Sequence, residues 1–181
     1  MSECNSYKMT IAGLERELPL CEVAEHLDIA AFVMFGDVEI TKAAAAKLLE
    51  KCPEHDIVVT AEAKGIPLCY ELARIGCGDY EIARKSIKTY DDDPIFCEVR
   101  SITTNAVQKL YLAKSRAKRI EGKRVLIVDD VISTGASLKV LEELVRKAGG
   151  IIVGEAAVLA EGEAADRDDI IFLEKLPLFP K

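Results

Sequence analysis

Residues 123–153 read KRVLIVDDVISTGASLKVLEELVRKAGGIIV. Residues 125–128 are apolar and rich in β-branched side chains, which predicts a short buried strand. A helix is predicted to begin near Ala136, because apolar residues follow it at helical spacing, namely Leu138, Leu141, Leu144, Val145 and Ala148. The stretch therefore begins as a strand and continues as an amphipathic helix.

A second strand is predicted directly after this helix. Gly149 and Gly150 end the helix, and residues 151–153 are again apolar and β-branched. An alternation of strand, helix and strand is typical of an α/β fold, in which a parallel sheet carries helices on both faces. Ligands of such folds bind beyond the carboxyl ends of the strands, so we expect the functional site at that edge.

The preceding part of the chain repeats this alternation. Residues 42–51 are strong helix formers, and residues 56–60 predict a buried strand. Residues 62–65 form a turn before a helix predicted at 66–75, which has a proline near its start and a glycine just past its end. A short further strand is predicted around Ile82 and Ala83. The turn 62–65 and the stretch 129–137 should therefore meet at one edge of the sheet.

A long polar stretch, residues 85–108, separates these two units. It contains Asp91-Asp92-Asp93-Pro94, and its flanks 96–100 and 108–112 predict a hairpin. Long loops within compact domains are usually functional. Because residues 87–108 lack the apolar periodicity that would hold them to a core, we expect this segment to be mobile without ligand.

The sequence at the end of the strand 125–128 is typical of a phosphate site. Residues 133–137, Ser-Thr-Gly-Ala-Ser, offer hydroxyls, a glycine and the free N–H groups of a helix start. Asp129 and Asp130 precede them, and two carboxylates beside a phosphate require a further ligand, either ribose hydroxyls or Mg²⁺. Together these groups favour a phosphorylated sugar. In the alternative interpretation they are turn and helix-capping residues.

Composition narrows the class of protein. The 181 residues have a net charge of −7, which argues against a nucleic-acid partner. The longest apolar stretch, residues 29–35, is too short to span a bilayer, and the N-terminus lacks the pattern of a secretion signal. The six cysteines lack metal-site spacing. We therefore expect a cytoplasmic protein without a membrane partner.

At residues 125–137 the sequence resembles the phosphoribosyl pyrophosphate signature of type I phosphoribosyltransferases. The resemblance implies that fold, with a mobile lid hairpin and a small hood made from both chain termini. It implies that Asp129 and Asp130 are catalytic, facing the ribose hydroxyls and any bound metal. The 5-phosphate would be held by Ser133, Thr134, Gly135, Ala136 and Ser137.

Three further segments agree with this family in order and spacing. The turn Glu62, Ala63, Lys64 and Gly65 is similar to the family's pyrophosphate turn, and Arg84 with Lys85 is similar to a basic pair that contacts pyrophosphate. Residues 87–108 correspond to the lid, for which Lys88, Ser101, Thr103 and Thr104 are candidate anchors. The chain would be a single domain, residues 1–181, with its hood at residues 1–40.

The resemblance implies an enzyme that transfers ribose 5-phosphate from phosphoribosyl pyrophosphate to a purine, with Mg²⁺ as cofactor and a homodimer as the assembly. Adenine is favoured, because Ser133 stands where hypoxanthine-guanine enzymes have an aspartate and Met34 where xanthine enzymes have a polar residue. Phe35 is the candidate for stacking on the base, and Leu173 for backbone contacts to its edge. Xanthine and orotate remain alternative acceptors.

A non-catalytic regulator that senses phosphoribosyl pyrophosphate is the alternative from another class of protein. Such a regulator uses the same fold behind a DNA-binding domain. The 40 to 50 residues before Ile57 are few for that purpose, and the negative net charge disfavours DNA binding. An enzyme is therefore the favoured hypothesis.

Overall fold

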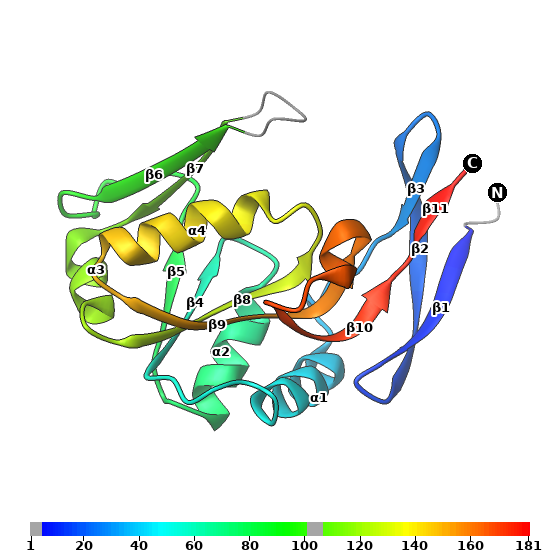
Figure 1. Cartoon of the computed structure of the whole chain (residues 1–181), viewed down its shortest axis with the longest axis horizontal. Helices are drawn as coiled ribbons and strands as arrows, with labels where there is room; N and C mark the ends of the chain where they lie inside the picture. The colour runs from blue at the N-terminus through cyan, green and yellow to red at the C-terminus, as the bar shows by residue number, and fades with distance from the viewer. Residues whose placement is uncertain (1–4, 101–106) are drawn as a thin grey trace.

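A five-stranded parallel sheet forms the centre of the computed structural model, which describes residues 5–100 and 107–181 (Figure 1). Its strand order is β10-β9-β8-β4-β5, and each neighbouring pair is parallel. The strands are β4 (Ile57–Ala61), β5 (Tyr80–Ala83), β8 (Arg124–Ile132), β9 (Ile151–Glu161) and β10 (Ile171–Leu176). The α/β fold with a parallel sheet is confirmed.

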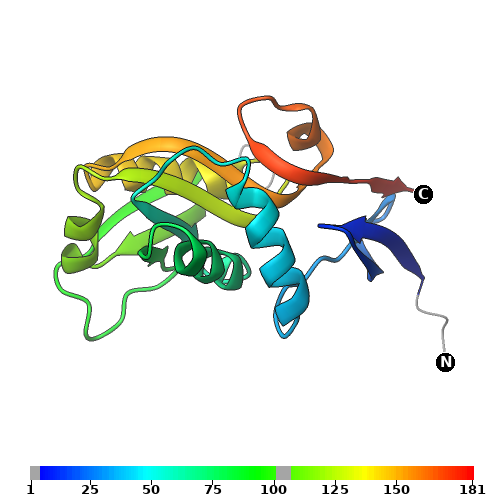
Figure 2. The same cartoon turned by 90° about the horizontal axis from the view of Figure 1, so that it is seen from below.

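Helices cover both faces of this sheet (Figure 2). Two of them, α1 (Val38–Leu49) and α2 (Ile66–Ile75), pack together on one face. The other face carries α3 (Lys114–Ile120) and α4 (Ala136–Lys147), whose apolar side chains form a second core cluster with Ile57, Val125 and Ile127. No helix in the described parts of the chain combines the length and apolar character that crossing a bilayer requires.

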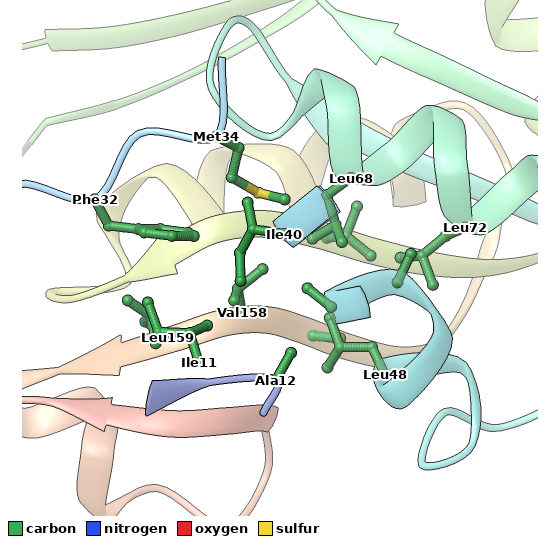
Figure 3. Close-up of a cluster of buried hydrophobic side chains, with 14 of the residues drawn as sticks. Ile11, Ala12, Phe32, Met34, Ile40, Leu48, Leu68, Leu72, Val158 and Leu159 are labelled. Carbon is green, nitrogen blue, oxygen red and sulfur yellow. The ribbon is translucent and has the colours of Figure 1, made fainter. Parts of the chain in front are cut away.

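The hood is an antiparallel sheet built from both ends of the chain. Its order is β1-β2-β3-β11, where β1 is Ser6–Ile11, β2 Leu14–Ala24, β3 Leu27–Ala30 and β11 Leu178–Pro180. Burial alternates along β1, so that one face packs on the core and the other meets solvent. The hood joins the core cluster of α1 and α2, in which Figure 3 labels Ile11, Ala12, Phe32, Met34, Ile40, Leu48, Leu68, Leu72, Val158 and Leu159.

The long polar stretch contains the predicted hairpin, formed by β6 (Ile95–Arg100) and β7 (Val107–Leu112). Its base is tied to the core, because Ile95 and Cys97 pack against the α4 cluster and Leu112 is buried. The expectation that nothing holds residues 87–108 to a core is therefore wrong for the base of the hairpin. The candidate anchors Ser101, Thr103 and Thr104 lie outside the described residues.

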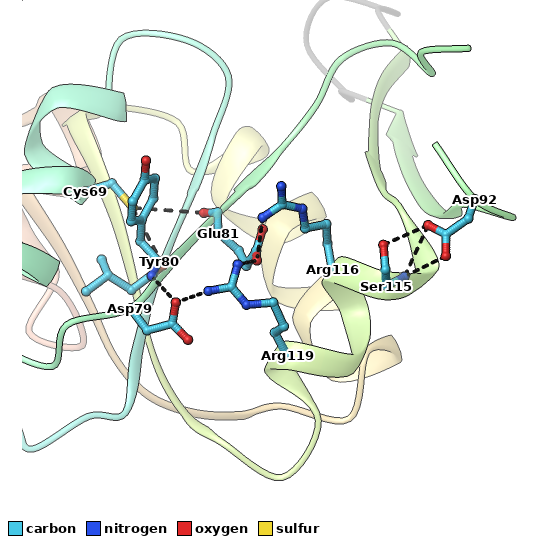
Figure 4. Close-up of polar contacts among 9 residues, drawn as sticks. Cys69, Asp79, Tyr80, Glu81, Asp92, Ser115, Arg116 and Arg119 are labelled. Atoms are coloured by element: carbon cyan, nitrogen blue, oxygen red, sulfur yellow. Dashed lines mark hydrogen bonds and ion pairs between the residues drawn. The ribbon is translucent and has the colours of Figure 1, made fainter. Parts of the chain in front are cut away.

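Ion pairs hold α3 to the sheet edge beside this hairpin (Figure 4). Glu81 on β5 is only 4% exposed, and Arg116 and Arg119 of α3 both pair with its Oε1. Burial raises the pKa of Glu81, while the two guanidinium groups lower it. Asp92 accepts a hydrogen bond of 2.8 Å from the hydroxyl of Ser115. The buried carboxylate of Glu81 needs its two arginine partners to stay ionised, and both arginines belong to α3. The charge of Glu81 therefore holds α3 against β5.

Two element boundaries differ from the sequence prediction. Helix α1 begins at Val38 rather than at residue 42, because Oδ1 of Asp37 accepts a 3.0 Å hydrogen bond from the N–H of Ile40 and so caps the helix earlier. Strand β8 continues through the acid pair to Ile132, because β9 pairs with it as far as Ala160. Asp129 and Asp130 therefore lie within the strand rather than after it.

We expect Asp37→Ala to lower the melting temperature by roughly 3–6 °C, measured by calorimetry. The variant loses the α1 cap, worth about 0.5–2 kcal/mol, and also the ion pair with Arg16 of the hood, whose Nε lies 2.7 Å from Asp37. Glu39→Ala is the matched control, because exposed Glu39 pairs with the same Arg16 at 2.8 Å without capping the helix. Equal destabilisation by the two variants would contradict this role of Asp37.

Candidate active site

The carboxyl ends of β4 and β8 bring the two predicted segments together. The turn 62–65 follows β4, and Gly65 lies directly against Asp129 of β8. A Cβ at position 65 would stand 3.0 Å from Oδ1 of Asp129 and would collide with the hydroxyl of Thr60. Glycine is therefore required at position 65 by close packing. The expected meeting of the two segments at one edge of the sheet is confirmed.

Asp129 and Asp130 form a desolvated carboxylate pair at this edge. Asp130 is 3% exposed, and Lys64 Nζ lies 3.0 Å from its Oδ2. Among the described residues this contact is an ion pair only, and no group makes a hydrogen bond to that oxygen. Burial, and secondarily the Asp130 carboxylate, raise the pKa of Asp129 to about 8. The pair can thus accept further hydrogen bonds, and burial disfavours the ionised form of Asp129.

The loop 133–137 presents an uncapped helix start. Gly135 is the N-cap of α4 in the left-handed conformation, with φ 72°, and no side chain in the described structure caps this helix. Free N–H groups at a helix N-terminus attract anions. Gly135 therefore caps α4 through its backbone alone, and the hydroxyls of Ser133, Thr134 and Ser137 do not take part in the cap. Ser133 is half-buried, and Thr134 and Ser137 are exposed.

The side chain of Ser137 is linked to the hairpin. Its hydroxyl donates a hydrogen bond of 2.9 Å to Oε1 of Gln108 on β7. The sequence offered no signal for this contact, because it joins residues that are far apart along the chain. It places the hairpin directly beside the loop 133–137.

The predicted pyrophosphate residues lie beside one another but are partly engaged among themselves. Glu62 accepts a 3.0 Å hydrogen bond from the backbone N–H of Lys85, and Arg84 Nε lies 3.9 Å from Glu62. Arg84 also donates to the hydroxyl of Tyr90 at 2.7 Å. The Glu62 side chain therefore positions the basic pair. Glu62, Arg84 and Tyr90 line a cavity of 710 Å³ below the turn 62–65.

The other residues predicted to bind pyrophosphate, among them Ala63, Lys64 and Lys88, have different surroundings. Lys64 is engaged with Asp130, and the peptide between Glu62 and Ala63 is cis. The backbone N–H of Lys88 donates to Asp91 at 2.7 Å, and the Lys88 side chain is half-exposed. The basic residues at this edge thus approach from two separate segments.

The two candidate base-binding residues have separate environments. Phe35 is 52% exposed and lines a 600 Å³ cavity between α1 and α2, together with Met34, Pro67 and Tyr70. Leu173 lies within β10, packs against the α1–α2 core cluster and is not among the residues that line this cavity. Phe35 is therefore available to a planar ligand, whereas the backbone of Leu173 belongs to a sheet strand.

Two ionisable residues at this edge were absent from the sequence-based set. Glu161 ends β9, and burial raises its pKa while nearby Lys64 lowers it. Arg167 follows the short 3₁₀ helix η1 (Gly162–Asp166), and its Nη1 would lie 3.0 Å from a Cβ at Gly135. The strand-end position of Glu161 was a usable signal. Arg167 carried no local signal, because its contact depends on the return of the chain after β9.

The described geometry suits a ligand with two kinds of group. The loop 133–137 can accept a phosphate, and the carboxylates beside it can accept hydroxyl hydrogen bonds or a cation. The turn 62–65 and the basic pair offer positive charge at the carboxyl ends of the neighbouring strands β4 and β5. A sugar that carries a phosphate at one end and an anionic leaving group at the other matches this arrangement.

Known proteins share these features. A family model described as a phosphoribosyl transferase domain matches residues 35–177. A hypoxanthine/guanine phosphoribosyltransferase from Methanotorris igneus is 31% identical over 160 residues, covering 83% of this chain and 83% of that protein. A purine biosynthesis transcriptional repressor from Bacillus subtilis is 32% identical over 113 residues, which are 62% of this chain and 39% of the repressor's length.

A solved structure agrees with these sequence relatives. The adenine phosphoribosyltransferase of Thermoanaerobacter pseudethanolicus matches with a TM-score of 0.64 at 26% identity, covering 77% of this chain and 82% of that one. The chain belongs to the phosphoribosyl transferase domain family.

Proposed function

We propose that this protein is a purine phosphoribosyltransferase, with adenine as its favoured acceptor. It would transfer ribose 5-phosphate from phosphoribosyl pyrophosphate to the base, giving a nucleoside monophosphate and pyrophosphate. The observation that carries the proposal is the carboxylate pair, with half-buried Asp129 and buried Asp130, placed shortly before a helix start that no side chain caps. One end of this arrangement suits the 5-phosphate and the other suits the ribose hydroxyls.

Each segment of the proposed site would bind a different part of the substrate. The loop 133–137 holds the 5-phosphate, and Asp129 and Asp130 accept hydrogen bonds from the ribose hydroxyls. The turn 62–65, with Arg84 and Lys85, faces the pyrophosphate. A ring nitrogen of the base bonds to C1 of the ribose as the C1–oxygen bond to pyrophosphate breaks, and the base loses a proton. Positioning and charge stabilisation supply the rate.

Magnesium is proposed as the cofactor. Mg²⁺ is usually held by one or two carboxylates together with substrate phosphates. The unsatisfied Oδ2 of buried Asp130 fits such a shared site. Among the described residues no cluster of three metal-binding side chains forms a site by itself, so the substrate oxygens would complete the coordination. When bound, the ion would neutralise charge on the leaving pyrophosphate.

Adenine is favoured over other acceptors on two grounds. The matched structure from Thermoanaerobacter pseudethanolicus is named an adenine phosphoribosyltransferase. Ser133 also offers no carboxylate to take a proton from a 6-oxopurine, and Met34 is apolar and buried. Xanthine and orotate are the alternatives, and enzymes named for these two bases are also among the relatives.

A non-catalytic sensor of phosphoribosyl pyrophosphate is the second candidate function. The similarity to the Bacillus subtilis repressor favours it. In this chain the described residues before α1 form the hood strands β1, β2 and β3. A sensor would bind phosphoribosyl pyrophosphate without turnover of any base, so a kinetic assay separates the two functions. The homodimer and the cytoplasmic location remain predictions, and light scattering would check the former.

The base is tested by parallel assays with Mg²⁺ and phosphoribosyl pyrophosphate against adenine, guanine, hypoxanthine, xanthine, uracil and orotate. Adenine should give the highest kcat/KM. A pyrimidine as best substrate would overturn the purine assignment. Tight binding of phosphoribosyl pyrophosphate with no turnover of any base would favour the sensor.

We expect Asp129→Asn combined with Asp130→Asn to weaken phosphoribosyl pyrophosphate binding by at least about tenfold, measured by calorimetry. The variant keeps the shape of the pair but removes the charge that strengthens hydrogen bonds to hydroxyls. Glu15→Gln combined with Glu17→Gln, both exposed on β2 of the hood, is the matched control. Unchanged affinity in the first variant would show that the acid pair faces another group.

Asp129 should also make the stability of the ligand-free protein depend on pH. Its pKa rises on folding from an ordinary 3.8 to about 8. The contribution of Asp129 to the free energy of unfolding is therefore fully present below pH 3.8 and is lost as the pH rises through about 8. Asp129→Asn has no charge to bury. The melting temperature of this variant relative to the wild type should rise by roughly 3 °C or more between about pH 5 and about pH 8.5.

Exposed Asp168→Asn is the control for this pH series, because its carboxyl is not desolvated. The difference between this control and the wild type should stay constant across the same range. A pH-independent difference for Asp129→Asn would mean that its carboxyl is already compensated in the folded protein.

A further inference from the structure

Arg167 contacts the backbone of the loop 133–137. The residue follows η1, which lies at the carboxyl end of β9 near the start of α4 (Figure 1). Its Nη1 would stand 3.0 Å from a Cβ placed on Gly135. The guanidinium therefore occupies the space that any side chain at position 135 would need. Glycine at this position is required both by its positive φ and by the presence of Arg167.

The rest of the guanidinium is held by one carboxylate. Arg167 Nε donates to Oδ1 of Asp169 at 2.8 Å, and Nη2 donates to Oδ2 of the same residue at 2.7 Å. Glu155 lies 3.9 Å from Nη2, on the same side of the guanidinium. Such a bidentate pair fixes the plane of the group. Arg167 is thereby oriented before any ligand arrives.

This orientation leaves Nη1 directed at the loop. In the described parts of the chain, Nη1 makes no hydrogen bond, although each terminal guanidinium nitrogen carries two N–H donors. The Arg167 side chain is 31% exposed, so its charge is partly shielded from water. A preoriented, partly desolvated donor beside an uncapped helix start is suited to an anion.

Charge at the loop supports the same conclusion. Residues 133–137 carry no charged side chain, so no side chain of the loop itself can form an ion pair with a phosphate. Lys64 lies nearer the acid pair, with its Nζ 3.0 Å from Oδ2 of Asp130. Arg167 is positioned to supply the missing positive charge from the other side of the loop.

We propose that Arg167 binds the 5-phosphate of the substrate through Nη1, with Asp169 as the residue that positions it. This inference rests on the proposed function, because it assumes that a phosphorylated ribose occupies the loop 133–137. It adds a charged side chain to a cradle that otherwise consists of backbone N–H groups and hydroxyls. The contribution is specific to the 5-phosphate, since the pyrophosphate residues approach from β4 and β5.

The test compares ligands that carry different parts of the substrate. Arg167→Gln should weaken binding of ribose 5-phosphate and of phosphoribosyl pyrophosphate by at least about tenfold in calorimetry. Binding of Mg²⁺-pyrophosphate, which lacks the 5-phosphate, should stay within about twofold of the wild type. Arg146→Gln on the last turn of α4 is the matched control, because it removes an exposed arginine from the other end of the same helix.

Arg167→Lys keeps the charge and provides a second variant if Arg167→Gln folds poorly. A lysine cannot pair with Asp169 through two nitrogens and still present a third donor to the loop. We expect ribose 5-phosphate affinity to fall by about threefold to tenfold in this variant, with pyrophosphate affinity unchanged. A parallel loss for both ligands would show a general structural role and would overturn the inference.

The wild-type protein separates this inference from the proposed function. If it binds neither ribose 5-phosphate nor phosphoribosyl pyrophosphate, the proposed function is wrong and the role of Arg167 is overturned with it. If it binds both, and Arg167→Gln binds them equally well, the proposed function stands and the role of Arg167 alone is overturned.

Discussion

The desolvated carboxylate pair in the middle of the sheet is the constraint on which the site depends. Asp129 and Asp130 lie on β8, a strand with neighbours on both sides and helices on both faces. Asp130 is 3% exposed, and Lys64 from the neighbouring turn approaches its Oδ2. Burying carboxylates costs stability unless partners satisfy them, and here the partners are incomplete. A ligand with hydroxyls or a cation would supply the missing partners of these carboxylates. The same unsatisfied carboxylates therefore lower the stability of the ligand-free protein and allow it to bind a ligand.

The two segments that are proposed to bind phosphate groups are held beside that pair by different contacts. The turn 62–65 is fixed by the close approach of Gly65 to Asp129. Glu62 in this turn accepts a hydrogen bond from the backbone of Lys85 and so links the basic pair to the turn. The loop 133–137 is fixed by the left-handed Gly135 and by the first turn of α4. Because both segments end strands of one rigid sheet, the distance between them is set by sheet geometry. Preorganised charge of this kind loses little free energy to rearrangement when the ligand binds.

Sequence reasoning succeeded where the determining interactions are local. The strand and helix within residues 123–153 were predictable because the spacing of apolar residues and the position of the glycines indicate the same element boundaries. Residues 66–75 were predictable for the same reason, and α2 has those bounds. The hood strands were not predicted, because β3 is completed by β11 from the opposite end of the chain. The packing of Ile95 and Cys97 on α4 was also missed, since two apolar residues do not establish a period.

The site shows the same division between local and long-range information. The acid pair and the loop 133–137 form one continuous run, so residue types and order indicated their chemistry. Arg167 reaches Gly135 only because the chain turns through η1 after β9, and Gln108 reaches Ser137 only because the hairpin folds back on α4. Glu62 was predicted only as part of the turn 62–65, and the structure adds that its side chain contacts the segment of Arg84 and Lys85. Only the folded chain reveals such partners.

The base is harder to assign than the sugar for a structural reason. The family match covers residues 35–177, and most of the hood lies before that range, in β1, β2 and β3. In the proposed function, the phosphoribosyl donor would bind at the sheet edge, where the acid pair and the loop 133–137 lie. In the proposed function, the hood and the segment around Phe35 would recognise the base, and Phe35 is at the very start of the matched range. Relatives named for adenine, hypoxanthine/guanine, xanthine and orotate all match this chain, as expected if they share the sugar site and differ at the base. Family membership therefore constrains the donor strongly and the acceptor weakly, and the acceptor must be determined by direct competition among bases.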